Sequence, residues 1–219
     1  LMLHPYGYVE GVFPESLYSH LGPQGCCIYS HQFYETDPSR GYVRGYTMHV
    51  LRGPGPVETA LSGFVRREIP WGAGHHAAFA ARFGHVISMA ILVEDLPEPC
   101  NAVTLDPDLR DKHGIPAPKV TYRLSANSKK MLAHGLDRSK KVMTTAGSVK
   151  NFSFAPVRHT GWHLMGTARM GTDSAGSVVN EWGRCHDVPN LFIVDGSVFV
   201  TSGGAYALLY PLRGFVDMS

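Results

Sequence analysis

Aromatic and branched residues alternate with polar residues through the first part of the chain, between Gly7 and Arg52. The clearest examples are residues 27–34 and 46–51. A period of two is typical of β-strands that have one buried face. Between these runs lie residues 22–25 and 37–41, in which Pro fixes φ and Gly accepts positive φ, as in tight turns. The pattern predicts a meander of antiparallel strands.

A short helix and a buried strand are predicted next. Residues 77–83 are rich in Ala and place Phe79 and Phe83 one helical turn apart, and Gly84 ends the run. Residues 86–93 form the longest nearly uninterrupted apolar stretch. A short apolar run bounded by turn residues favours a buried strand. It is far shorter than the ~20 residues that a membrane-spanning helix needs.

Two further strands and a long helix are predicted in the middle of the chain. Residues 102–105 and 120–124 have the composition of strands, and a polar, turn-forming stretch over residues 106–118 joins them. Ser125 is a candidate N-cap, because its hydroxyl can accept a hydrogen bond from the first helical turn. Apolar residues at helical spacing then predict a helix over residues 126–146.

The composition of the sequence changes near residue 150, where we place the main domain boundary. Gly-rich loops dominate from residue 151 onward. One apolar run, residues 191–194, is predicted as a strand that leads directly into Asp195 and Gly196. Mostly antiparallel strands with a few helices predict an α+β fold.

Composition argues against several classes of function. The 219 residues include 20 basic and 18 acidic side chains, so no nucleic acid is expected as a partner. With 44% hydrophobic and 17% charged residues, the chain can build a core. No segment matches the P-loop, nucleophile-elbow or zincin motifs. Nucleotide hydrolysis, α/β-hydrolase chemistry and zincin proteolysis therefore lose their usual sequence support.

Twelve histidines raise the question of a metal site. His159 and His163 have the i, i+4 spacing that places two imidazoles on one helix face. Gly161 and Trp162 disfavour a regular helix there, and no carboxylate or Cys stands at ligand spacing nearby. We therefore predict no metal ligand, and metal-dependent hydrolysis ranks last among the functions considered.

Two positions could carry chemistry. His163 lies between Trp162 and Leu164 on a Gly-bounded turn, where partial burial can keep an imidazole neutral and basic near pH 7. A core histidine is the alternative. Asp195 ends an apolar run and is followed by Gly196, so a carboxylate and a backbone N–H could meet a ligand at a sheet edge. A simple strand-terminating turn is the alternative there.

The last third of the chain carries a more specific pattern. Residues 163–171, His-Leu-Met-Gly-Thr-Ala-Arg-Met-Gly, resemble the H-x-x-G-T-x-R-M-G segment of the glucose–methanol–choline (GMC) oxidoreductases. Residues 190–204 resemble that family's N-L-x-V-x-D-[AG]-S…T-S-G-G segment, in the same order and at similar spacing. Residues 1–5 resemble the end of its N-L-x-x-H-P element. The resemblance thus covers nearly the whole chain.

The resemblance implies oxidation of a polyol, sugar or related alcohol with FAD as cofactor. His163 would then be the general base that takes the hydroxyl proton while the alcohol carbon gives a hydride to the flavin. Asp195 and Gly196 would contact the FAD. The implied fold is a mostly antiparallel substrate-domain sheet with helices plus the C-terminal segment of an FAD-binding α/β domain. It divides the chain into residues 1–12, trailing the FAD-binding domain, residues 13–150, the substrate-binding domain, and residues 151–219, the C-terminal catalytic segment.

Two features depart from the family pattern. The family's GxGxxG-bearing Rossmann segment, which holds the ADP half of FAD, is missing from the chain. A separate or longer FAD-binding segment is therefore expected as a partner. The family's second catalytic Asn or His corresponds to Tyr206, whose phenol can donate a hydrogen bond but cannot accept a proton at pH 7. An altered or truncated C-terminus is the other interpretation.

The alternative to catalysis is a silent α+β binding module that keeps the substrate-domain sheet and lacks a complete flavin site. The particular alcohol and the electron acceptor depend on a pocket assembled from loops, and no local motif encodes them.

Overall fold

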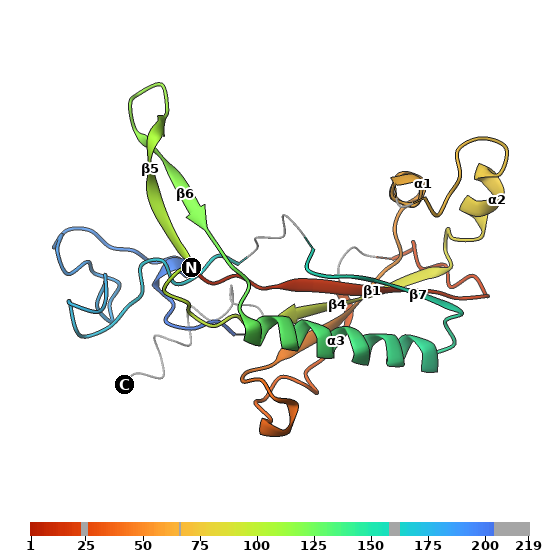
Figure 1. Ribbon diagram of the computed structural model, residues 1–219, viewed down its shortest axis with the longest axis horizontal. Helices are drawn as coiled ribbons and strands as arrows, with labels where there is room; N and C mark the ends of the chain where they lie inside the picture. Colours follow the sequence, from red (N-terminus) through yellow and green to blue (C-terminus); the bar gives the residue numbers. More distant parts are fainter. Residues whose placement is uncertain (23–25, 66, 158–162, 204–219) are drawn as a thin grey trace.

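The computed structural model describes residues 1–22, 26–65, 67–157 and 163–203. At its centre is a five-stranded antiparallel sheet with the strand order β2-β3-β4-β1-β7 (Figure 1). Its strands are β1 (Tyr6–Val12), β2 (Cys26–Ser30), β3 (Tyr46–Leu51), β4 (Val86–Val93) and β7 (Lys150–Phe154).

Strands β2 and β3 confirm part of the predicted meander, and β4 confirms the buried strand predicted after it. Residues 46–51 and 86–93 are strands at their predicted bounds, and the predicted strand over residues 27–34 corresponds to the shorter β2. Strands β2, β3 and β4 pair consecutively. Strand β1 instead lies between β4 and β7, its neighbours from far along the chain.

Helix α3 (Ala126–Thr145) covers one face of the sheet. Ser125 is its N-cap, and the Ser125 hydroxyl accepts a hydrogen bond from the N–H of Ser128 at 3.0 Å, as predicted. The buried side chains of α3 recur at helical spacing and pack against the sheet. The core between the two consists of Val9, Tyr42, Tyr46, Met48, Met89, Ile91, Val93, Met131, Leu132 and Met143.

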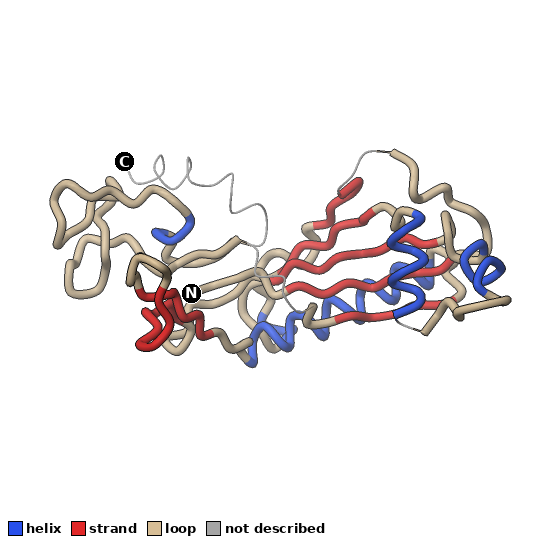
Figure 2. Tube along the Cα trace, turned by 90° about the horizontal axis from the view of Figure 1, so that it is seen from above, coloured by secondary structure: helices blue, strands red, loops and turns tan. Residues whose placement is uncertain are grey.

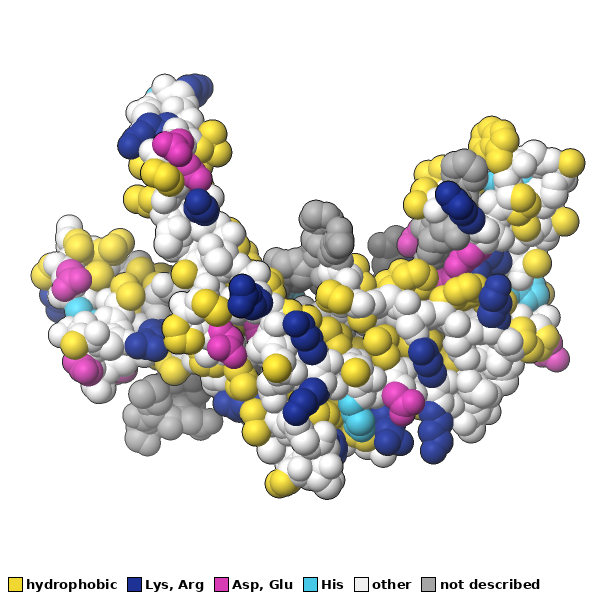
Figure 3. Space-filling view, in the orientation of Figure 1, with side chains coloured by type: hydrophobic (Ala, Val, Ile, Leu, Met, Phe, Trp, Pro, Cys, Tyr) yellow, Lys and Arg dark blue, Asp and Glu magenta, His cyan; other side chains and the backbone are white. Residues whose placement is uncertain are grey.

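The opposite side of the sheet is flanked by two projections. Helices α1 (Pro56–Val65) and α2 (His75–Ala80) lie at one end, and the hairpin of β5 (Ala102–Arg110) and β6 (Pro116–Thr121) lies at the other (Figure 1). Figure 2 shows α1 crossing the strands on the side away from α3. The space-filling view shows the hollow between the two projections (Figure 3).

Arg82 ties the α1–α2 end to the sheet. Its guanidinium is buried and donates to the carboxylate of Glu10 on β1. The same guanidinium pairs with Glu68 at 3.0 Å and lies 5.3 Å from the ring centre of Phe152. Since buried charges are tolerated only when they are paired, this arrangement fixes the position of the segment that follows α2.

Two predictions for the middle of the chain need correction. The hairpin is longer than expected, because β5 runs to Arg110 and β6 begins at Pro116, so much of the turn predicted over residues 106–118 is strand. Its polar side chains are compatible with strands because most of the hairpin is exposed. The second correction is α1, a helix that the sequence analysis does not predict. Pro56 begins it, and a proline is tolerated there because the N–H groups of the first turn have no partner within the helix.

The strand predicted over residues 191–194 is also wrong. The segment forms a single antiparallel bridge, between Arg184 and Phe192. The side chains of Leu191, Phe192 and Val194 are exposed. The prediction of a strand there depended on the apolar run alone. Such a run favours a strand because the strand buries it, and these three side chains are not buried.

The observed fold is mixed, with mostly antiparallel sheets and few helices, as expected for an α+β chain. Strand β7 begins at residue 150, the position of the expected domain boundary, and pairs with β1. The division of the chain at residues 12 and 150 stays a prediction. Within the described ranges, no helix is both long and apolar enough to cross a membrane.

Candidate active site

The first motif, residues 163–171, lies between the N-terminal residues and the turn that follows residue 194. On one side, Met2 and Met165 exchange two backbone hydrogen bonds of 2.8 and 3.1 Å. On the other side, three further N–H groups of the motif donate at 2.8 to 3.2 Å to the carbonyls of Gly196, Ser197 and Val198. The two sequence motifs are therefore adjacent in the fold.

Close backbone approach explains two glycines at this junction. Gly166 has φ of +82°, and a Cβ there would lie 2.6 Å from Cε of Met2. A Cβ on Gly196 would lie 2.7 Å from the carbonyl oxygen of Leu164. A Cβ does not approach a backbone oxygen this closely, so the two motifs can meet at Gly196 because it lacks a side chain, and the positive φ of Gly166 likewise favours glycine.

His163 combines an unusual backbone with an unusual side-chain environment. Its φ is +56°, in the left-handed region that residues other than glycine adopt rarely. Its ring meets the ring of His4 edge to face, with centroids 5.0 Å apart. Nδ1 of His163 and Nε2 of His4 are both buried, and neither has a hydrogen-bond partner among the described residues. Buried polar atoms without partners are rare and mark candidate functional groups.

His4 is buried, and so is a further histidine near this contact, His49. Burial lowers the pKa of His4 to about 4, and the neighbouring rings of His163 and His49 act in the same direction. Burial is also the main cause of the lowered pKa of His49 on β3, whose Nε2 lies 2.8 Å from the hydroxyl of Thr47. Both rings are therefore neutral at pH 7, and they add no positive charge beside His163.

Asp195 caps the short 3₁₀ turn η2 (Gly196–Val198). Its Oδ1 accepts hydrogen bonds from the hydroxyl of Ser197 at 2.6 Å and from the N–H of Ser197 at 2.8 Å. These bonds hold the pKa of the carboxyl below its usual value, so Asp195 is ionised at neutral pH. The carboxylate is exposed beside the first motif, where it can accept hydrogen bonds from the hydroxyls of a bound molecule.

The T-S-G-G segment, which begins at Thr201, contacts the rest of the fold through a hydrogen bond to Asp95. The hydroxyl of Ser202 donates to the carbonyl of Asp95 at 2.6 Å. The Asp95 carboxylate is buried and accepts from the hydroxyls of Tyr122 and Ser128 at 2.8 and 2.9 Å. Burial raises the pKa of Asp95, and these hydrogen bonds oppose the rise. Tyr206 lies outside the described residues, so its expected role stays a prediction.

A hollow of about 650 Å³ opens beside the first motif. Gly166, Thr167 and Arg169 contribute to its lining, together with the N-terminal residues Leu1 and Met2. Polar and apolar groups are mixed along its wall. It is the hollow that the family motif itself lines, and it adjoins the junction with the Asp195 turn.

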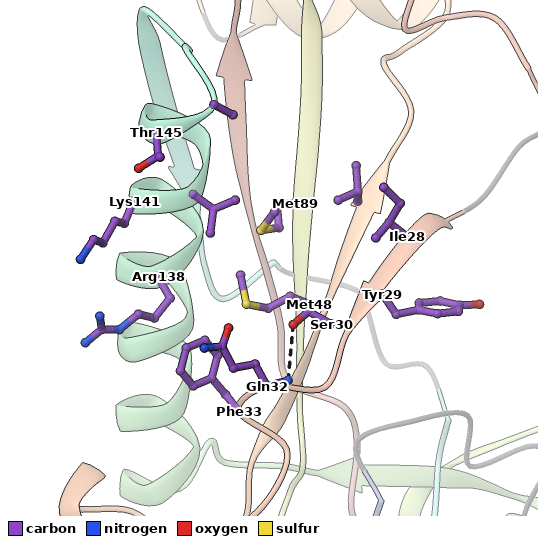
Figure 4. Close-up of a pocket in the computed structure, with 13 residues that line it drawn as sticks. Ile28, Tyr29, Ser30, Gln32, Phe33, Met48, Met89, Arg138, Lys141 and Thr145 are labelled. Carbon is purple, nitrogen blue, oxygen red and sulfur yellow. Dashed lines mark hydrogen bonds between the residues drawn. The ribbon is translucent and has the colours of Figure 1, made fainter.

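A second groove, of about 670 Å³, lies on the α3 side of the sheet (Figure 4). Met48 and Met89 point toward α3 there, whereas Tyr29 points away from it. Because successive side chains of a strand face opposite sides, Met48 and His49 on β3 lie on opposite faces of the sheet. This groove is therefore separate from the histidine contact.

The metal prediction is only partly open to test. Within residues 1–22, 26–65, 67–157 and 163–203, no group of three or more His, Cys, Asp and Glu side chains could hold a metal ion. His159 lies outside these ranges, so its spacing with His163 stays untested.

The sequence analysis singled out His163, Asp195 and Gly196, and the structure brings all three to one junction. It did not single out His4, His49 or Asp95. His4 belongs to the H-P pair of the N-terminal element. That pair supported the resemblance to the family but did not indicate a chemical role for His4. The other two gave no local signal, because their burial depends on strands and helices distant in sequence.

Comparisons with known proteins agree on one family. A family model described as GMC oxidoreductase matches residues 97–210. The 2-methyl-1,2-propanediol dehydrogenase of Mycolicibacterium austroafricanum is 40% identical over 183 residues, which are 83% of this chain and 33% of that protein. The fructose dehydrogenase large subunit of Gluconobacter japonicus is 33% identical over 122 residues, 56% of this chain and 22% of that protein.

A third relative is the gluconate 2-dehydrogenase flavoprotein of Pantoea cypripedii. It is 28% identical over 137 residues, which are 59% of this chain and 22% of that protein. The chain spans a third or less of the length of these three relatives.

Proposed function

This chain belongs to the GMC oxidoreductase family, and we propose that it forms the substrate-facing and proton-accepting part of an FAD-dependent alcohol dehydrogenase or oxidase. The relatives include dehydrogenases named for a diol, for fructose and for gluconate. We therefore propose a polyol, sugar or related alcohol as the substrate, with its CH–OH group as the electron donor.

The observation that carries the proposal is the environment of His163. Its backbone conformation, the buried Nδ1 and the contact with His4 constrain the ring. The other ring nitrogen, Nε2, can take the proton of the substrate hydroxyl. Such general-base assistance is worth ~10²–10⁴ in rate. A neutral His4 beside the ring leaves His163 free to become positively charged when it takes the proton.

The residues around His163 also suit the flavin cofactor. When bound, FAD supplies the acceptor for the hydride that leaves the alcohol carbon. The exposed, ionised carboxylate of Asp195 would accept hydrogen bonds from ribityl or ribose hydroxyls, because a carboxylate repels a pyrophosphate. The N–H of Gly196 is proposed to face the same part of the cofactor. The ADP half would be held by a Rossmann segment in the same or in a separate polypeptide.

A flavin titration tests the function. The 219-residue chain would be titrated with FAD alone and together with a separately expressed N-terminal half of a GMC relative. Absorbance and fluorescence report binding, and 2-methyl-1,2-propanediol, fructose and gluconate serve as trial reductants. Binding with bleaching by one of these alcohols supports the proposal. Absence of binding under both conditions contradicts it and favours the silent binding module.

A further inference from the structure

The bridge between the N-terminal residues and the first motif lies next to the contact of His4 with His163. Met2 and Met165 form an antiparallel bridge. His4 and His163 each lie two residues from that bridge, on the two segments that it joins. Their rings are indeed in contact, with centroids 5.0 Å apart. The bridge therefore holds the backbones that carry the two histidines close together.

The chemical state of His4 follows from its hydrogen bond and its burial. Nδ1 of His4 lies 3.2 Å from the carbonyl oxygen of Val93, and a carbonyl only accepts, so Nδ1 carries the proton. The residue is 4% exposed, and burial lowers its pKa to about 4. The neutral ring thus has its lone pair at Nε2, which lacks a partner in the described part of the chain.

His163 has the complementary requirement. If Nε2 of His163 is to take a proton, the neutral ring must carry its own proton on Nδ1. This Nδ1 is buried and has no partner in the ranges that the structure describes, and a buried N–H without an acceptor costs free energy. The lone pair of the neighbouring His4 can accept that hydrogen bond.

We propose that His4 is a positioning residue, whose Nε2 accepts a hydrogen bond from Nδ1–H of His163 and thereby keeps Nε2 of His163 free as the base. The inference rests on the function proposed above, in which His163 takes the hydroxyl proton. When that proton arrives at Nε2, the His163 ring becomes an imidazolium whose Nδ1–H remains bonded to His4. The pair then carries a single positive charge, and the proton later leaves from Nε2.

NMR of the ring nitrogens tests this pair in the 219-residue chain without any cofactor. In isotope-labelled protein, the ring signals of His163 are those that disappear in His163→Gln. We expect the proton of His163 on Nδ1, and a scalar coupling across the hydrogen bond from Nδ1 of His163 to Nε2 of His4.

Two substitutions of His4 form a matched pair. His4→Asn keeps an amide donor for the carbonyl of Val93 and removes the acceptor at the Nε2 position, whereas His4→Gln places an amide oxygen at that position. We expect the Nδ1–H form of His163 to be lost in His4→Asn and retained in His4→Gln. Circular dichroism confirms that each variant has the wild-type secondary structure.

The outcomes separate this inference from the proposed function. A proton on Nε2 of His163 in the wild type would overturn the inference by itself, whatever the variants do. An unchanged His163 tautomer in folded His4→Asn would also overturn it. If the histidine pair is observed in a chain that never reduces a flavin, the proposed function fails while the contact stands. If the enzyme is active but the tautomer of His163 does not depend on His4, only this inference fails.

Discussion

His4 should make the folded chain sensitive to mild acid. The pKa of His4 is lowered from 6.5 to about 4 in the folded chain, so the unfolded chain takes up a proton first as the pH falls. The contribution of His4 to the free energy of unfolding is therefore fully present above pH 6.5 and is lost as the pH falls from 6.5 to 4. At 1.36 kcal/mol per pH unit, this interval corresponds to about 3 kcal/mol, of which about 2 kcal/mol is lost by pH ~5.

Urea denaturation of the wild type and of His4→Asn at pH ~7.5 and pH ~5 measures this contribution. Asn does not titrate, yet it can still donate to the carbonyl of Val93. Titrating groups distant from His4 contribute equally to both proteins and cancel in the comparison. We expect the free energy of unfolding of the wild type to fall by about 2 kcal/mol more than that of the variant. Equal losses in the two proteins would refute the reasoning.

Three further substitutions test the packing of the fold by urea or thermal denaturation. Arg82→Met should cost about 3–5 kcal/mol, because it removes the buried guanidinium that pairs with the buried carboxylate of Glu10 and the partly buried carboxylate of Glu68, and a loss below 1 kcal/mol would contradict the buried ion pair. Ser125→Ala should cost about 1 kcal/mol through loss of the N-cap of α3, whereas an unchanged midpoint would show that the cap is dispensable. Gly135→Val should cost about 1–3 kcal/mol, since a Cβ at Gly135 would lie 2.6 Å from Cγ2 of the buried Ile91; wild-type stability would mean that the helix can shift.

Much of the local structure could be predicted from the sequence. The strand over residues 86–93 and the helix that begins after Ser125 carry their own signals, an apolar run bounded by turns and an N-cap followed by helical spacing. The wrong prediction at residues 191–194 also came from an apolar run. An apolar run predicts a strand only where other elements bury it, and three of these side chains are exposed.

The long-range arrangement could not be predicted in this way. No local pattern shows that β1 lies between β4 and β7, or that Met2 pairs with Met165. The contact of His4 with His163 depends on that pairing. The family motifs predict His163 and Asp195 as site residues, and only the fold shows that the buried ring of His4 contacts His163. Motifs therefore predict where the site lies, and the contacts between distant segments decide which groups surround it.

The role of His163 is the central claim, and the rate of flavin reduction by an alcohol under anaerobic conditions tests it most directly. The measurement compares wild type, His163→Gln and His76→Gln in the flavin-loaded protein, with His76 as an exposed histidine on α2. We predict equal flavin content in all three proteins, a rate lowered by ~10²–10⁴ in His163→Gln, and an unchanged rate in His76→Gln. A wild-type rate in flavin-loaded His163→Gln would contradict the account.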